Sequence, residues 1–208
     1  MKQVALIILF LTSFMISSLI FPENNSTLNY THVLFEWQQM ENADEYQIQI
    51  SDDISFSNIS TDTMSQSLIY IEKNYIDWNS VYYWRVHALN NGNSIGEWSD
   101  IYLFSTSPKR SNAETVIYDN EEIQDGLTIF SSFFDYFSAI IDNEGKEIWN
   151  TENTNLVYYT NDNYGQLYGT QFSASENELH GIKFSIDNEI LWSETGDSYV
   201  HHDFFELP

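Results

Sequence analysis

Two adjacent histidines and an aspartate, His201, His202 and Asp203, are the residues of this chain best suited to chemistry. They follow a strand-like run that begins at Tyr199. Histidine exchanges protons near neutral pH and can act as a nucleophile, and a neighbouring carboxylate can hold an imidazole in one tautomer. We therefore predict that this segment carries nucleophilic or acid–base chemistry.

A strand limits how many of these side chains can share one site. Successive residues point to opposite faces, so only one of His201 and His202 should face the site unless a β-bulge intervenes. A metal centre built from these histidines and Asp203 is a second interpretation, but neighbours in one strand rarely converge on one ion and no third ligand is evident. We predict no metal and no cofactor, because the chain also has no glycine-rich phosphate loop.

The charge of the chain excludes several partners. Seven basic residues against 31 acidic ones give a net charge of -24, which repels nucleic acid and anionic lipid. We predict no nucleic-acid partner and interpret the acidity as a solvated surface. Calcium binding is the alternative, but no Asp-x-Asp-x-Asp-Gly loop is present.

The elements that must position the histidines begin after an apolar leader. Residues 1–20 combine an early Lys2 with a long apolar run, the pattern of a secretory signal, although an uncleaved anchor of this length remains an alternative. The absence of cysteine excludes a disulfide framework and a lipoprotein attachment site. We predict export to the periplasm, cell surface or extracellular space, with membrane contact only through an uncleaved signal.

Residues 22–107 break into short apolar or alternating runs that predict an all-β sandwich. Tyr82, Trp84, Val86 and Ala88 fall on one face of such a run, as do Tyr46, Ile48 and Ile50. The run from Tyr82 to Ala88 and the later Gly96-Glu97-Trp98-Ser99 resemble a fibronectin type III domain. The resemblance implies a spacer or adhesion module without chemistry of its own.

A proline and two basic residues mark residues 108–114 as a linker, and residues 115–208 as a second domain. In that domain Ile141–Trp149 recurs in shortened form as Ile186–Trp192, with the aspartates 45 and the tryptophans 43 residues apart. A period in the forties is typical of β-propeller blades, although two similar hairpins could also arise by chance.

Residues 115–208 resemble the bacterial arylsulfotransferase family. The resemblance rests on Gly126–Phe130, Ala139–Trp149 and, most specifically, His201–Pro208. It implies a β-propeller that moves a sulfuryl group from an aryl sulfate donor to a phenolic acceptor without a nucleotide. It also implies that His201 or His202 is transiently sulfated, with Asp203 as an orienting partner.

The sequence thus predicts a fibronectin type III-like β-sandwich followed by an incomplete β-propeller. A propeller needs about four to eight blades of about 40 residues, and residues 115–208 hold about two. We therefore expect a fragment of an exported arylsulfotransferase-like enzyme, and no turnover by the 208-residue form. The alternative is a non-catalytic secreted protein for adhesion or binding.

Overall fold

The structure is a computed structural model, and it describes residues 17–112, 125–172 and 179–195. These residues are all-β, as predicted, and contain no helix. Consequently, no helix in this part of the chain could cross a membrane. Contacts divide the chain into two compact units. The first takes in the residues up to Asn24, Phe35–Tyr70 and Tyr82–Leu103; the second takes in Asn25–Leu34, Ile71–Val81 and the residues from Phe104 onward.

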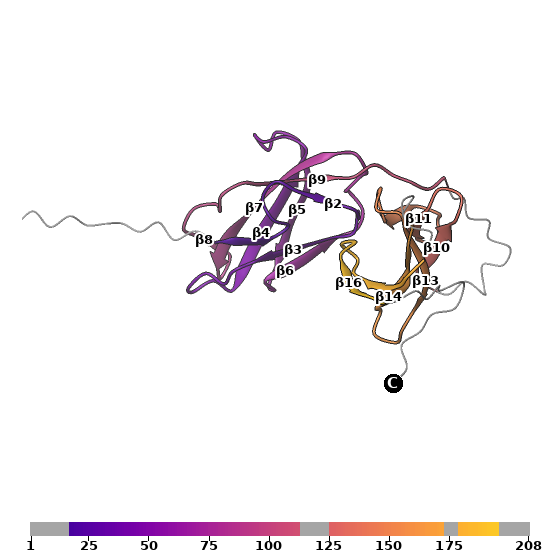
Figure 1. Cartoon of the computed structure of the whole chain (residues 1–208). Helices are drawn as coiled ribbons and strands as arrows, with labels where there is room; N and C mark the ends of the chain where they lie inside the picture. Colours follow the sequence, from indigo (N-terminus) through magenta and orange to yellow (C-terminus); the bar gives the residue numbers. More distant parts are fainter. Residues whose placement is uncertain (1–16, 113–124, 173–178, 196–208) are drawn as a thin grey trace, which may run out of the picture. The chain divides into compact units, whose positions relative to one another are not determined.

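The N-terminal strands form two sheets in a sandwich-like arrangement (Figure 1). The smaller sheet has the order β1-β3-β6, and the larger has the order β2-β9-β7-β4-β5 with β8 paired to β7. Their bounds are β1 Leu19–Phe21, β2 Ser26–Leu28, β3 Val33–Trp37, β4 Glu45–Ser51, β5 Ile59–Ser65, β6 Ile69–Glu72, β7 Val81–Asn90, β8 Asn93–Ile95 and β9 Tyr102–Thr106.

The predicted two-residue alternation determines the core of the first unit. On β4 and β7 the paired residues Ile48 and Val86, and the paired residues Ile50 and Trp84, are all fully buried. Phe35 of β3 packs on Trp84 with ring centroids 5.1 Å apart, which joins the two sheets through aromatic rings. Inward residues of facing sheets interdigitate in this way in β-sandwiches.

The remaining strands form two further antiparallel sheets, both within the second unit. One has the order β10-β11-β12 and the other the order β13-β14-β15-β16. Their bounds are β10 Thr128–Ser132, β11 Phe137–Ile141, β12 Glu147–Asn150, β13 Leu156–Asn161, β14 Leu167–Gln171, β15 Gly181–Phe184 and β16 Ile190–Ser193. Residues of both sheets share a buried cluster that includes Trp149, Leu156 and Phe184.

Three hairpins of these sheets end in the same turn. Asp142, Asp162 and Ser185 begin the turns, and each accepts two backbone N–H bonds through its side chain, from the residues two and four positions later. The fourth residue of each turn is in the left-handed region, namely Gly145, Gly165 and Asn188. Short polar side chains that bond the following backbone, and Gly or Asn at positive φ, are the chemistry such a turn needs.

The equivalence of these turns corrects the predicted alignment of the repeat. The position of Asp142 is taken by Ser185 rather than by Asp187, so the spacing is the same as that of Trp149 and Trp192, 43 residues. The two hairpins, β11–β12 and β15–β16, also share their register and an irregularity at the same place, between Ile140 and Ile141 and between Lys183 and Phe184. The hairpin repeat is therefore exact in backbone pairing.

Candidate functional site

The predicted site residues His201, His202 and Asp203 lie outside the described residues. The described histidines are spread over different elements. The ring of His87, on β7, packs at a tilt against that of Trp98 with centroids 4.9 Å apart, and its Nε2 hydrogen-bonds the hydroxyl of Ser94 at 2.8 Å. His32 has a lowered pKa because of burial first and of the charges of Lys73 and Lys146 second. His180 immediately precedes β15. None of these positions brings two histidines together.

A β-bulge occupies the strand of the second unit that carries two adjacent tyrosines. On β13, Tyr158 pairs with Gly169 and Thr160 with Tyr168, so that Tyr159 is the extra residue. Tyr158 packs against the buried cluster of this unit, and Tyr159 stacks on Phe133 at 6.0 Å. Burial raises the pKa of both phenols above its ordinary value.

Within the second unit, buried polar groups hold the segment that follows β9, residues 107–112, in place. The carboxylate of Glu147, 1% exposed, accepts the backbone N–H groups of Arg110 (2.9 Å) and Ser111 and the side-chain amide of Asn150 (2.7 Å). The Asn150 amide also donates to the carbonyl of Pro108 at 3.1 Å. A buried carboxylate is stable only with such donors, so Glu147 and Asn150 fix the path of this segment.

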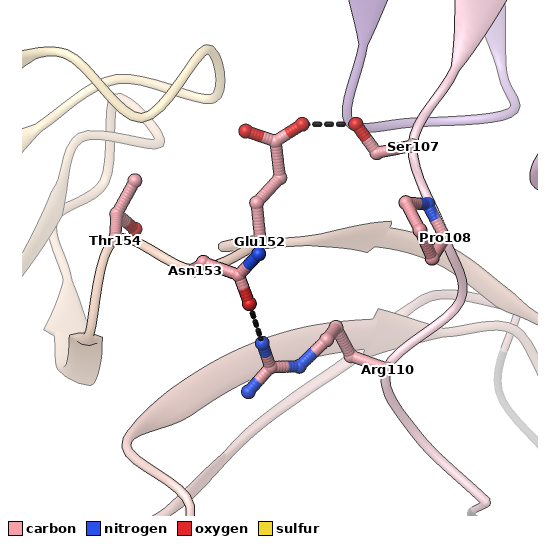
Figure 2. Close-up of a pocket in the computed structure, with 6 residues that line it drawn as sticks. All are labelled: Ser107, Pro108, Arg110, Glu152, Asn153 and Thr154. Carbon is pink, nitrogen blue, oxygen red and sulfur yellow. Dashed lines mark hydrogen bonds between the residues drawn. The ribbon is translucent and has the colours of Figure 1, made fainter.

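A cavity of about 380 Å³ lies where this segment meets the turn after β12. Six residues line it: Ser107, Pro108, Arg110, Glu152, Asn153 and Thr154. Figure 2 shows the carboxylate of Glu152 directed at Ser107 and the guanidinium of Arg110 directed at Asn153, so the two charged groups do not point at one another. All six residues belong to the second unit.

The charged groups of the cavity are held in place. Arg110 donates to Oδ1 of Asn153 at 2.5 Å and to the carbonyl of Asp135 at 3.4 Å, and its guanidinium lies 5.2 Å from the centre of the Phe137 ring. Glu152 contacts the hydroxyl of Ser107 and adopts a φ of 50°. A left-handed backbone costs about 1 kcal/mol or more at a residue other than Gly, Asn or Asp.

The sequence did not predict this cavity. Its two segments lie about 40 positions apart, and the first had been interpreted only as a linker. One signal was present: Glu147 and Asn150 are polar residues at the two ends of a strand whose four residues are all buried. Within the described ranges no group of three or more His, Cys, Asp or Glu side chains could hold a metal ion.

Comparison with known proteins gives no family for this chain. No protein-family model matches it, and no curated protein is a significant match. Among solved structures, an α-L-rhamnosidase from Dictyoglumus thermophilum is similar over 63% of this chain, with 14% identity and a TM-score of 0.37. The matched region spans 17% of that structure's chain, and a likeness of this size carries no argument about fold or activity.

Proposed function

We propose that this protein is an exported arylsulfotransferase-like enzyme, in which a sulfuryl group passes between phenols through His201 or His202. Export and the family resemblance are part of the proposal, as are the fibronectin type III-like nature of the sandwich and the propeller-like nature of the second half. The observation that best supports the proposal is the 43-residue hairpin repeat. At this spacing the His-His-Asp segment corresponds in sequence to a segment in the described part of the chain.

The counterpart is β13. Trp192 stands 43 residues after Trp149, and at the same spacing Val200 follows Val157 and the pair His201-His202 follows the pair Tyr158-Tyr159. The β13 strand carries its bulge at those tyrosines. A bulge re-aims a side chain and is common beside active sites. The proposal includes the same bulge at His201-His202, which would let both imidazoles face one site.

The chemistry requires two displacements at sulfur. An imidazole nitrogen attacks the sulfur of the donor, the bond between sulfur and the aryl oxygen breaks, and the phenolate leaves, to be protonated by an acid group or water. The oxygen of the acceptor phenol then attacks the same sulfur as its proton is removed, and the nitrogen–sulfur bond breaks to restore the histidine. Asp203 would hold the imidazole in the tautomer that presents a free nitrogen.

The test is an assay of the full product of the gene, because we expect no turnover by the 208-residue form alone. The assay uses an aryl sulfate donor and a phenol, together with the variants His201→Ala, His202→Ala and a control, His87→Gln. We expect one of the first two variants to lose transfer and the control to retain it, since His87 lies on a strand of the sandwich. Donor alone should add the mass of one SO3 group to a peptide containing His201 and His202. Absence of transfer and of that adduct in the wild-type product would contradict the proposal.

A second candidate function is ligand binding without catalysis. It is favoured by the cavity between Ser107 and Thr154, which is built from rigidly held polar side chains and does not involve the histidines.

A further inference from the structure

We propose that the cavity lined by Arg110 and Glu152 binds a small neutral carbohydrate. The inference rests on the described geometry alone and holds whether or not the chain transfers sulfuryl groups. At about 380 Å³ the cavity exceeds the volume of a single water by an order of magnitude and lies in the range of small-molecule sites.

The site is organised before any ligand arrives. The backbone N–H of Arg110 is bonded to Glu147, and its side chain is bonded to Asn153. The backbone N–H of Glu152 donates to Oδ1 of Asn150 at 2.8 Å, which fixes the turn. Because these groups are already ordered, a ligand would bind without the entropic cost of immobilising them.

The mixture of donors and acceptors matches hydroxyl groups. A guanidinium offers five N–H donors, of which the structure uses one for Asn153 and one for the Asp135 carbonyl. Glu152 offers only acceptors. The hydroxyls of Ser107 and Thr154 donate to Glu152 and to the carbonyl of Thr151, so they also present acceptor lone pairs to a ligand. Sugar hydroxyls both donate and accept, so a pyranose could satisfy this wall and lay a C–H face on the ring of Pro108.

Charge argues for a neutral ligand. The cavity carries one cationic and one anionic side chain, Arg110 and Glu152, so neither an anion nor a cation is matched by the wall as a whole. The net charge of -24 further opposes the approach of an anion. A neutral polyol is repelled neither by the unmatched charge of the wall nor by the net charge of the chain. Its hydroxyls exchange hydrogen bonds with water for hydrogen bonds with the wall, which offsets the cost of desolvation.

The test uses the full chain and three probes: methyl α-D-glucopyranoside, methyl α-D-galactopyranoside and cellobiose, titrated by calorimetry and by saturation-transfer NMR. Glu152→Gly removes the carboxylate while relieving the left-handed backbone, so the variant should fold at least as well as the wild type. Glu152→Gln keeps the side chain and removes only its charge. The matched control is Asn155→Gly, which changes a second left-handed residue of the same turn that does not line the cavity.

We expect at least one sugar to bind the wild type at millimolar concentration. Binding should be about tenfold weaker in both Glu152 variants, as for a lost charged hydrogen bond, and unchanged in Asn155→Gly. Acetate and methylammonium should bind more weakly than the sugar. No binding of any sugar, an equal loss in the Asn155→Gly control, or tighter binding of either ion would overturn the inference.

Discussion

Both units consist of short strands, but different kinds of side chain stabilise these strands in each unit. In the first unit large aromatic residues are buried between sheets, as in the packing of Trp37 on Tyr46 at 5.6 Å. In the second unit polar residues fix strand ends and turns: Ser138, Asn150 and Thr151 are all fully buried and hydrogen-bonded. Apolar packing leaves little room for a ligand, whereas a polar framework can leave hydrogen-bonding groups around a cavity.

In the first unit the charged side chain of Arg85 is held by neighbouring side chains. Arg85 lies between the rings of Phe56 and Trp98, at 4.0 and 4.2 Å, and donates twice to Gln49. In the second unit, by contrast, Arg110 lines a cavity while its guanidinium donates to Asn153 (Figure 2) and to the carbonyl of Asp135. A charged side chain of an all-β unit therefore indicates a binding site where it also lines a cavity.

The largest effect that tests this comparison is expected from Trp84→Ala. Trp84 is fully buried and also packs on Tyr102 at 6.1 Å, so its loss should lower the free energy of unfolding of its unit by about 3–5 kcal/mol. Trp192→Ala, at a tryptophan that is 48% exposed, serves as the matched control and should change stability by less than about 1 kcal/mol. Urea denaturation followed by circular dichroism measures both. Equal losses would show that aromatic burial does not distinguish the two units.

An intermediate effect is expected in the second unit from Gly169→Ala. A Cβ at this position would lie 2.0 Å from the carbonyl oxygen of Val157, so β13 and β14 would have to separate. Overpacking of this kind typically costs about 1–3 kcal/mol. Gly126→Ala is the control, since nothing lies within 4 Å of its added Cβ. A Gly169→Ala protein as stable as the control in urea would mean that the sheet accommodates the change by moving at its exposed edge.

Much of the fold could be predicted from the sequence, because apolar and polar residues alternate along a strand that is buried on one face only. The alternating runs Tyr46–Ile50 and Tyr82–Ala88 lie within the observed strands β4 and β7. Strand β5, Ile59–Ser65, was not predicted, because it has polar residues on both faces and buries only Thr61. The turn at Asp162 was missed as a third copy because the tryptophan that marked the other two has no counterpart in it.

The candidate sites show a different limit. Residues His201, His202 and Asp203 were found because they adjoin one another, but their arrangement lies outside the described part of the chain. The cavity has no such pattern of neighbouring residues, because Arg110 and Glu152 lie far apart in the sequence. Hydrogen bonds of the buried Glu147 and Asn150, and direct bonds between the two segments, bring them to one cavity. A pattern confined to neighbouring residues cannot report a contact between distant segments.

We expect the smallest effect on stability from changing one turn carboxylate in each unit and lowering the pH. The pKa of Asp162 lies below its ordinary value of 3.8, mainly because the N–H of Gln166 donates to the carboxylate, with further help from Tyr164 and Lys183. The pKa of Asp53 in the first unit is lowered much further, by the hydroxyl and N–H groups of Ser55 and Ser57. A carboxylate with a lowered pKa stabilises the fold above its unfolded pKa, and this contribution is lost as the pH falls through the folded value.

Asp162→Asn and Asp53→Asn should therefore lower the thermal midpoint at pH 7 and reduce the difference from wild type as the pH approaches 3, with the larger change for Asp53. Both side chains are partly exposed, so solvent keeps each effect small. Differences between variants are needed because protonation also relieves the repulsion of a chain with a net charge of -24. Glu144→Gln, an exposed change within the turn of Asp142, controls for lost charge alone. If all three variants followed one pH curve, the turn carboxylates would act only as surface charge, and the polar framework of the second unit would reside in its buried groups.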